Sequence, residues 1–365
     1  MAARIIIFGA TGFTGRLIAE RLSAQGAPAV VAGRSERSVR ELADRLGLEW
    51  GVADALRQNS VFALVQPGDV LVSTVGPFLK WGEPAVRAAI AAKGVYIDST
   101  GEPPFIRRVF EEFGPPAERA GASLLTAMGY DYVPGALAGA LALEQAGPDA
   151  VRVDIGYYAF GAGVSAGTRR SAVGIMLEDG FAFRGAALRS ARIAERVRSF
   201  RVKGKDRDAI SIGGAEHLTL PPVHPALLEV NVYLGWFGAL ARPLQAGSLA
   251  GSAAMRVPGV RAAMKAAADR LVEVAGGPDE PGSGISWIAA EAYDADGGRL
   301  AEVQLTGGEP YQLTAGIIAW AARRAAAQGV ARAGALGPVE AFGLRALEEG
   351  CREAGLERVS DPAVA

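Results

Sequence analysis

The feature that most constrains the fold is a glycine-rich loop that follows the first apolar run without a break. Residues Ile5–Phe8 are continuously apolar, as in a strand buried on both faces, and the run Gly9-Ala-Thr-Gly12-Phe-Thr-Gly15 comes next, before a helical pattern. Glycines permit close backbone approach, and a helix N-terminus offers free N–H groups to a pyrophosphate. The spacing is G-x-x-G-x-x-G, so a purely structural turn is the alternative. The strand–loop–helix context favours dinucleotide binding.

Short apolar stretches alternate with helical patterns through the first third of the chain. After Ile5–Phe8, these stretches are residues 29–32, 48–53, 70–75, 95–97 and 122–126. Such alternation is typical of a parallel, doubly wound sheet with helices on both faces. We therefore expect an α/β protein that begins with a Rossmann domain.

The pattern changes after about residue 134. Longer strand-like stretches occupy residues 151–160, 283–293 and 299–305, and Asp296-Gly-Gly298 joins the last two as a hairpin. These strands predict a second α+β domain with a mixed sheet. Helical patterns are expected at residues 181–207, which are rich in arginine and lysine, and at residues 262–274, 314–328 and 338–354.

Three segments follow from this organisation. Residues 1–133 should form the dinucleotide-binding domain, and residues 134–310 should form a domain for the substrate and for dimerisation. The helices of residues 311–365 should pack back onto the Rossmann domain.

The end of the second apolar stretch indicates which dinucleotide is bound. An acidic residue about 20 positions beyond the glycines would hold the ribose of NAD, whereas this chain has Gly33, Arg34 and Ser35 there. A guanidinium can bind a 2′-phosphate through two hydrogen bonds, and a serine hydroxyl can add another. The sequence therefore favours NADP. Glu36 keeps NAD open, and Arg34 could instead be a solvated charge at a helix start.

Two further segments contribute cofactor-binding candidates. Asp54 could accept from the adenine amino group, or it could cap a helix beginning near Ala55. The loop Val75-Gly76-Pro77 follows the fourth strand, where ligands lie in this architecture. The complete set of cofactor-binding candidates is Gly9, Thr11, Gly12, Phe13, Thr14, Gly15, Gly33, Arg34, Ser35, Asp54, Val75, Gly76 and Pro77.

Several motifs in this order resemble the saccharopine dehydrogenase-like oxidoreductases, a group that includes trans-acting enoyl reductases. These motifs are Gly9–Gly15, Ala32-Gly-Arg34, Thr74–Phe78 with Gly82-Glu-Pro84, Asp98–Glu102 and Gly129–Pro134, followed more weakly by Gly163–Thr168 and Gly308–Tyr311. The resemblance implies a Rossmann domain, a mixed-sheet second domain and a pyridine nucleotide. It does not imply saccharopine as the substrate.

Candidate catalytic residues follow the fourth, fifth and sixth strands. Hydride transfer needs a proton donor and a group that stabilises developing negative charge. The titratable residues expected near the nicotinamide are Lys80, Glu102, Tyr130, Asp131 and Tyr132. Glu102 could instead bond a turn, Asp131 could cap the helix near Pro134, and the two tyrosines could be packing aromatics.

These observations predict an NADP-dependent oxidoreductase that reduces a C=C, C=O or C=N bond of a small or lipid-like metabolite. One alternative is opine-type reductive amination, with Arg169 and Arg170 facing a carboxylate. Another is a non-catalytic NADP-binding sensor or lipid-surface protein.

Composition narrows the class further. The 38 basic and 39 acidic residues nearly cancel, which shows no footprint for nucleic acid. Cys351, the single cysteine, suits a reducing cytoplasm, and two histidines with one cysteine argue against a zinc site, so no metal is expected. Residues 230–255 are apolar but interrupted by Arg242-Pro243, so no transmembrane span is expected, while peripheral membrane contact stays open. We expect a homodimer.

The remaining histidines and aromatic residues are expected to be structural. His217 and His224 flank a Pro-Pro pair and are interpreted as satisfied loop or core histidines, although His217 could face the substrate. Four aromatic residues are expected in the core or in a pocket wall: Tyr233, Trp236, Phe237 and Trp287.

Overall fold

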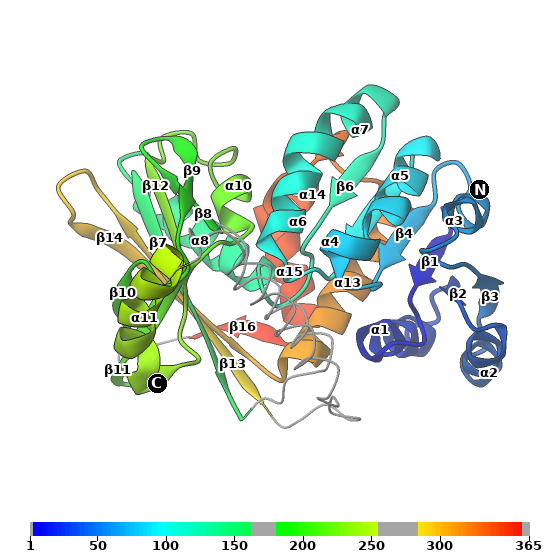
Figure 1. The fold of residues 1–365 in the computed structure, drawn as a ribbon, viewed down its shortest axis with the longest axis horizontal. Helices are drawn as coiled ribbons and strands as arrows, with labels where there is room; N and C mark the ends of the chain where they lie inside the picture. Colours follow the sequence, from blue (N-terminus) through cyan, green and yellow to red (C-terminus); the bar gives the residue numbers. More distant parts are fainter. Residues whose placement is uncertain (1–2, 162–179, 255–283, 360–365) are drawn as a thin grey trace. The chain divides into compact units, whose positions relative to one another are not determined.

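The computed structural model describes residues 3–161, 180–254 and 284–359, which form two compact units (Figure 1). The first unit joins Met1–Val133 to Tyr311–Gly355, and the second joins Pro134–Pro310 to the segment that starts at Leu356. Each unit is built around its own sheet.

The first unit contains a seven-stranded parallel sheet. Its strands are β1 (Ile5–Phe8), β2 (Ala29–Gly33), β3 (Glu49–Val52), β4 (Val70–Ser73), β5 (Val95–Asp98), β6 (Ser123–Leu125) and β15 (Gly334–Ala335). They lie in the order β15-β6-β5-β4-β1-β2-β3, and all pairs are parallel. β1, β2 and β4 are buried along their whole length, which explains their continuous apolar sequence. The predicted doubly wound fold class is confirmed.

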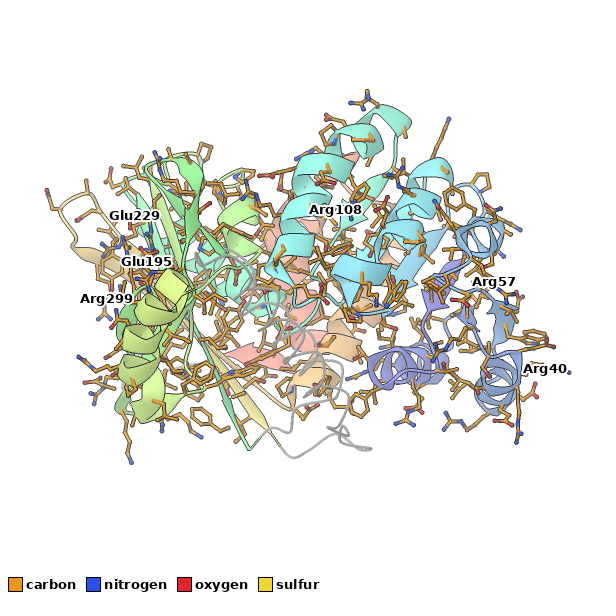
Figure 2. The ribbon with its side chains drawn as sticks, viewed as in Figure 1. Arg40, Arg57, Arg108, Glu195, Glu229 and Arg299 are labelled. Carbon is orange, nitrogen blue, oxygen red and sulfur yellow. The ribbon has the colours of Figure 1, made fainter. Side chains whose placement is uncertain are left out.

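Helices connect these strands and cover the sheet. They are α1 (Phe13–Ala24), α2 (Glu36–Leu46), α3 (Gln58–Leu64), α4 (Phe78–Trp81), α5 (Glu83–Ala91), α6 (Pro103–Arg108), the π-helical turn η1 (Val109–Phe113) and α7 (Gly114–Ala120). Leu71, Tyr96, Phe105 and Leu124 are fully buried in one shared core. At the surface, Arg108 joins neighbouring helices because its guanidinium binds Glu83 at 2.7 Å and Glu112 at 2.8 Å (Figure 2).

The C-terminal helices of the first unit are α13 (Pro310–Gln328), α14 (Pro338–Phe342) and α15 (Leu344–Glu353). The helix expected at residues 338–354 is therefore two helices, because Gly343 between them has a φ of 80°. On α15, Gly350 lies against Trp320 of α13, whose ring also makes an edge contact with Phe342.

The second unit contains a mixed sheet. Its strands are β7 (Arg152–Phe160), β8 (Gly180–Arg184), β9 (Ala187–Ala191), β10 (Val197–Val202), β11 (Lys205–Ile212), β12 (Glu229–Leu234), β13 (Ile285–Tyr293), β14 (Arg299–Gly307) and β16 (Leu356–Arg358). The main path is β10-β11-β12-β7-β13-β14-β16; off this path, β8 pairs with β12, and β9 pairs with β8. β12 and β7 are parallel while their other neighbours are antiparallel, and the predicted hairpin of β13 and β14 is confirmed.

Short helices accompany this sheet. They are α8 (Val133–Ala146), α10 (Glu216–Thr219), the 3₁₀ turn η2 (Gly238–Leu240) and α11 (Ala241–Ala254). Residues 230–254 therefore form a strand followed by a helix, and none of the described helices is both long and apolar enough to cross a membrane.

The prediction of a helix at residues 181–207 is wrong, because this stretch forms β8, β9, β10 and the start of β11. Tight turns at Gly185-Ala186 and Lys203-Gly204, all with positive φ, fold it into two hairpins. The arginines lie on partly exposed strands, while Phe200 and Val202 alternate inward. A high content of charged residues could not distinguish a solvated strand from a solvated helix.

A second difference concerns the end of the chain. The helices of residues 311–365 were expected to pack onto the Rossmann domain. Helices α13, α14 and α15 belong to the first unit, whereas β16 at the end of this segment pairs antiparallel with β14 of the second unit. The helix expected at residues 262–274, the motif Gly163–Thr168, and the candidates Arg169 and Arg170 lie outside the described residues.

Aromatic side chains fill the core of the second unit. Tyr233 and Trp287 are buried there beside Phe200, whereas Trp236 and Phe237 are 40% and 38% exposed and so lie outside the core. Phe200 lies so close to Gly156 of β7 that a Cβ there would be 2.9 Å from its ring. Only glycine therefore lets β10 pack at this distance.

We expect Gly350→Ala to lower the stability of the first unit. The new Cβ would lie 2.2 Å from the ring of Trp320, and overpacking of this kind costs about 1–3 kcal/mol. Thermal unfolding followed by circular dichroism measures the loss. The matched control is Gly247→Ala on α11, where the Cβ meets open space and alanine favours the helix by about 1 kcal/mol. Equal melting temperatures of Gly350→Ala and the unchanged protein would contradict the packing argument.

Candidate functional site

The strand order of the first sheet defines where a ligand belongs. β1 lies between β2 and β4, and the connections from β1 and from β4 lead to opposite sides of the strand order. Ligands of doubly wound sheets bind at this switch point, beyond the carboxyl ends of the strands. The loops that begin at Gly9 and at Thr74 both leave the sheet here.

The three glycines of the first loop have different tasks. Gly9 has a φ of +93°, and a Cβ there would lie 2.7 Å from the Thr74 hydroxyl. A Cβ on Gly15 would lie 2.3 Å from the Gly9 carbonyl oxygen. Gly12 is exposed, and its Cβ would come only within 3.3 Å of that same oxygen. The fold therefore requires Gly9 and Gly15, whereas Gly12 leaves the outer surface of the loop open.

Thr74 locks the two loops together. Its hydroxyl donates to the carbonyl oxygen of Gly9 at 3.1 Å, with the oxygen of Phe8 at 3.4 Å. Thr74 was not among the cofactor candidates. The sequence feature that could have indicated its role is a hydroxyl side chain directly after β4, the strand that neighbours β1 in the sheet.

The start of α1 presents backbone donors to the outside. The helix begins at Phe13, and its first internal hydrogen bond runs from Arg16 N–H to the Gly12 carbonyl at 2.9 Å. The N–H groups of residues 13–15 are therefore not used within the helix. Thr11 and Gly12 are exposed beside them, Thr14 is half-buried, and the Phe13 ring is fixed by an edge contact with Tyr311, 5.0 Å between centroids. This arrangement fits a pyrophosphate group.

The tip of β2 carries the residues expected to select the dinucleotide. Arg34 is exposed and makes no ion pair within the described part of the chain. Ser35 is the N-cap of α2, and its hydroxyl oxygen accepts from the Ser38 N–H at 3.4 Å. Gly33 lies under the same turn, where a Cβ would be 3.6 Å from the Thr11 hydroxyl. Arg34 is thus available to a ligand, while Ser35 already has a structural role.

Asp54 does not cap a helix at Ala55, because α3 begins only at Gln58. Its carboxylate instead accepts from the Leu56 N–H at 3.0 Å and shapes the turn after β3. The loop after β4 is arranged as expected for a ligand-facing segment. Gly76 is exposed, Pro77 follows it through a cis peptide bond, and Val75 packs against the core.

Glu102 holds this same loop in place. It is buried, and its two carboxylate oxygens accept from the backbone N–H groups of Phe78 at 2.8 Å and Leu79 at 2.9 Å. These are unsatisfied donors at the start of α4, so the carboxylate neutralises a helix N-terminus. The structure therefore gives Glu102 a positioning role. Lys80, on the same helix, is exposed and lies over the Trp81 ring at 4.7 Å.

Asp98 is a second buried carboxyl group at the edge of the sheet. One oxygen accepts from the N–H groups of Thr100 at 2.9 Å and Ala127 at 2.8 Å, and the other accepts from the Thr126 hydroxyl at 2.7 Å. Burial nevertheless raises its pKa to about 6. Asp98 thus ties the loop after β5 to the loop after β6, which carries the next candidates. Sequence reasoning placed it in a motif without assigning it a role.

Residues 130–132 follow β6. Tyr130 and Tyr132 are buried, and the Tyr132 hydroxyl donates to the Gly101 carbonyl at 3.2 Å. Asp131 keeps some exposed surface, but its carboxyl group is surrounded by protein and burial raises its pKa to about 6. An oxygen of that carboxyl would lie 2.7 Å from a Cβ on Gly101, so glycine makes room for it.

Asp131 differs from the other two acids. It makes no hydrogen bond or ion pair with any other residue of the described chain, and it does not cap α8. Its carboxyl group is therefore available to act as an acid or base, whereas Glu102 and Asp98 are committed to backbone donors.

The remaining polar candidates have structural partners. His217 is buried, with its Nδ1 within 3.0 Å of the Gly214 backbone nitrogen, and His224 Nε2 lies 2.9 Å from the Ala150 carbonyl oxygen. Within the described ranges, no three His, Cys, Asp or Glu side chains are grouped as a metal site would require.

The architecture consists of a Rossmann-type unit and a mixed-sheet unit, and known proteins share it. The yeast saccharopine dehydrogenase (L-Glu forming) from Saccharomyces cerevisiae superposes with a TM-score of 0.60 over 98% of this chain and 100% of the enzyme, at 12% identity. That likeness shows the fold.

Sequence relatives match a shorter part of the chain. A trans-acting enoyl reductase of Mycobacterium bovis is 36% identical over 137 residues, and a Mycobacterium tuberculosis protein provisionally given the same name is 39% identical over 137 residues. A lipid droplet localized protein of Caenorhabditis elegans is 30% identical over 143 residues. Each match covers 36% of this chain, and the chain spans about a third of the length of these curated relatives.

No family model matches the chain. The resemblance to saccharopine dehydrogenase-like proteins and trans-acting enoyl reductases is nevertheless confirmed, by the fold in the first case and by the matched segment in the second.

We expect Asp98→Asn to change the pH dependence of stability. The folded pKa of Asp98 lies above its unfolded value, so the folded state binds more protons between about pH 4 and 6. The contribution of Asp98 to stability is therefore present at pH 4 and is lost as the pH rises through 6. The stability of the variant relative to the unchanged protein should increase by about 2–3 kcal/mol from pH 4 to pH 7. Denaturant unfolding at each pH measures the difference. Asp44→Asn, at an exposed site on α2, is the control. A difference that is constant with pH would contradict the assignment.

Proposed function

We propose that this protein is an NADP-dependent oxidoreductase. The observation that carries the proposal is the Gly9–Gly15 loop at the switch point of the sheet, with the N-terminus of α1 behind it. The relatives named trans-acting enoyl reductase and the saccharopine dehydrogenase fold support the same class of reaction.

The residues present fit a dinucleotide. Gly12 leaves room outside the loop, the N–H groups of residues 13–15 can bind the pyrophosphate, and Arg34 can bind a 2′-phosphate. Asp54 lies near the end of β3, where an adenine would be held, and the Val75–Pro77 segment would lie along the nicotinamide side. When bound, NADP supplies the hydride acceptor, or NADPH the hydride donor. The protein's own task is to orient the reactants and to move the proton.

Asp131 is the best candidate for the proton donor. Its pKa of about 6 keeps about a tenth of the group protonated at pH 7, and its carboxyl group is not engaged by another described residue. Glu102 positions the loop before α4, and the Tyr132 hydroxyl fixes Gly101 beside Asp131. Tyr130, Tyr132 and Lys80 stay alternative proton donors.

The substrate proposed is a small or lipid-like metabolite with a C=C, C=O or C=N bond. Reduction of a C=C bond is supported by the name of the mycobacterial relatives, and a lipid-like character by the name of the nematode relative. A homodimer and a cytoplasmic location stay predictions from the sequence.

The first test concerns the loop. Gly12→Val should abolish binding of NADPH, because a branched side chain would occupy the space expected for the pyrophosphate. Its Cβ would lie 3.3 Å from the Gly9 carbonyl oxygen, a tight contact that a small shift of the loop relieves. Fluorescence titration with NADPH measures binding, and thermal unfolding monitors the fold. Gly15→Ala is the contrasting variant, since its Cβ would strike the Gly9 carbonyl and should lower stability itself. Binding of NADPH to Gly12→Val within a few-fold of the unchanged protein would overturn the proposed site.

The second test concerns the choice of cofactor. Arg34→Ala should weaken NADPH binding about tenfold to a hundredfold and leave NADH binding nearly unchanged, because a charged hydrogen bond contributes about 1.5–3 kcal/mol. Arg37→Ala is the matched control, since Arg37 is exposed on the same turn but is paired with Glu41 at 2.8 Å. Equal losses for both cofactors, or tighter binding of NADH than NADPH by the unchanged protein, would contradict the preference for NADP.

The third test concerns the proton. Asp131→Asn should lower kcat by about 10²–10⁴-fold while leaving the NADPH Kd and the melting temperature close to those of the unchanged protein. In the unchanged protein, reduction should slow as the pH rises through about 6, since the donor form of Asp131 is then lost. NADPH oxidation, with acceptors screened among enoyl, carbonyl and imine compounds, measures the rate. If Asp131→Asn keeps full activity, the tyrosines are tested next as Tyr130→Phe and Tyr132→Phe.

A further inference from the structure

The second unit contains a small polar pocket that is separate from the glycine loop. Its polar and aromatic lining comes from β8, the segment after β9, β11, α10 and β12, and consists of Phe181, Arg184, Arg192, Ser211, His217 and Asn231. The pocket is small and partly open, with a cavity volume of about 10 Å³. Drug-sized ligand sites have volumes of about 300–1,000 Å³, so only a small ion or one end of a small group can enter it.

The charge that faces this pocket is positive. Two guanidinium groups and no carboxylate are among its lining residues. Glu195 lies outside the lining and pairs with Arg184 through Nη1 at 2.7 Å, while Arg192 Nη1 donates to the Ser248 hydroxyl at 2.8 Å. The Nε of Arg184 is buried and has no hydrogen-bond partner among the described residues. A buried guanidinium N–H without an acceptor is a vacancy that an anion can fill.

His217 adds a neutral ring to the same wall. The residue is 2% exposed, and its Nδ1 lies 3.0 Å from the Gly214 backbone nitrogen and 2.9 Å from the Gly214 carbonyl oxygen. The Gly214 backbone therefore engages Nδ1, and Nε2 is the ring nitrogen that these contacts do not use. Burial lowers the pKa of His217 to about 4, so the ring is neutral at pH 7. The Phe181 ring packs edge-on against it, 5.7 Å between centroids.

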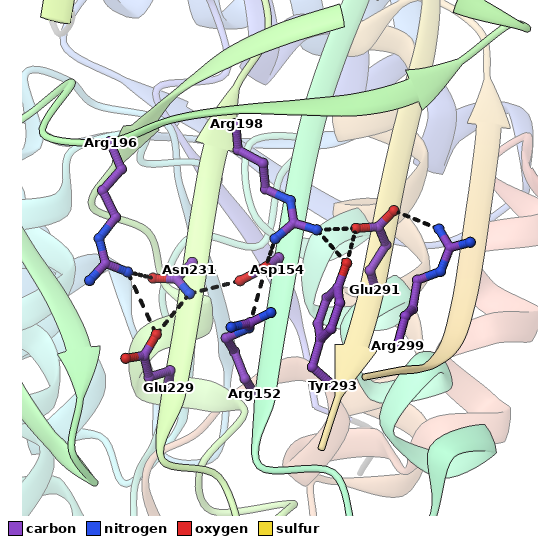
Figure 3. Close-up of polar contacts among 9 residues, drawn as sticks. All are labelled: Arg152, Asp154, Arg196, Arg198, Glu229, Asn231, Glu291, Tyr293 and Arg299. Carbon is purple, nitrogen blue, oxygen red and sulfur yellow. Dashed lines mark hydrogen bonds and ion pairs between the residues drawn. The ribbon is translucent and has the colours of Figure 1, made fainter. Parts of the chain in front are cut away.

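The nearest acids on the adjoining strands are already neutralised, as Figure 3 shows. Asn231 connects the pocket to this ionic network, because its Nδ2 donates to Asp154 at 2.7 Å and its Oδ1 accepts from Arg196 at 3.3 Å. Asp154 is also bound by Arg198, and Glu229 lies 3.6 Å from Arg196. These carboxylates therefore do not impose a net negative field on the pocket, and the network holds Asn231 in place.

We propose that this pocket binds a small monovalent anion, either chloride or the carboxylate group of an organic acid. Arg184 and Arg192 supply the charge, and Ser211, His217 and Asn231 surround it with polar groups. The proposal does not depend on the oxidoreductase function, since every residue involved belongs to the second unit and none is in the dinucleotide loop.

The test uses the fact that the chain contains only two histidines. With ¹³C-labelled histidine, the ring signals of His217 report on the pocket, and those of His224, held against the Ala150 carbonyl, serve as the internal reference. The protein is titrated at pH 7 with sodium chloride and, separately, with sodium acetate. Each salt replaces an equal ionic strength of the sodium salt of a bulky sulfonate buffer, so that only the anion changes. We expect a saturable shift of the His217 signals alone, with at least one of the two anions binding below about 20 mM.

Three variants complete the experiment. Arg184→Gln and Arg192→Gln should each weaken the anion at least fivefold, whereas Arg201→Gln, an exposed arginine on β10 outside the lining, should not. Thermal unfolding checks that each variant is folded. If either Arg184→Gln or Arg192→Gln does not fold, the other still tests the proposal. Saturation by chloride alone or by acetate alone identifies the source of the anion. No saturable shift with either anion, equal shifts of both histidines, or equal losses in all three variants would overturn the proposal.

Discussion

The close approach of the first glycine loop to the end of β4 is the contact on which the proposed dinucleotide site depends. The Thr74 hydroxyl reaches the Gly9 carbonyl, and that carbonyl occupies the space where a Gly15 Cβ would lie. With a side chain at either glycine, α1 could not start so near to the sheet. Its unsatisfied N–H groups would then point elsewhere, and the anion-binding character of the helix N-terminus would be lost.

Buried carboxylates extend this organisation along the carboxyl edge of the first sheet. Glu102 accepts from the first N–H groups of α4, and Asp98 accepts from two backbone N–H groups and a threonine hydroxyl. Three successive loops are thereby held by side-chain contacts. Burial raises the pKa of Asp98, because it disfavours the charged carboxylate. The group is tolerated there because several hydrogen-bond donors converge on it. Asp131 has no such donors in the described chain, which separates a candidate reactive acid from positioning acids of the same type.

The second unit shows how arginine-rich strands can be stabilised. Arg198 on β10 pairs with Asp154 on β7 and with Glu291 on β13, so side chains that are distant in sequence form one network across the sheet (Figure 3). Such pairing offsets the cost of removing charges from water. It also engages the carboxylates, so they are not available to other groups. Arg184 and Arg192, which line the pocket beside Asn231, are not part of this network.

The sequence by itself determined the Rossmann fold and the position of its glycine loop. Both follow from local patterns, namely continuous apolar runs such as Ile5–Phe8 and glycines directly before a helix. The hairpin of β13 and β14 was predictable for the same reason, from two strand-like stretches around Asp296-Gly-Gly298.

Only the tertiary structure decided which acids are committed and which is available. Glu102, Asp98 and Asp131 look alike along the chain, and what distinguishes them is the set of backbone donors that other loops bring within 3 Å. It also decided that residues 181–207 are strands, because their charged side chains find partners on β7, β12 and β13 that no local pattern could reveal. Hydrophobic periodicity is a property of neighbouring residues, whereas the partner of a buried charge is set by contacts between segments far apart in sequence.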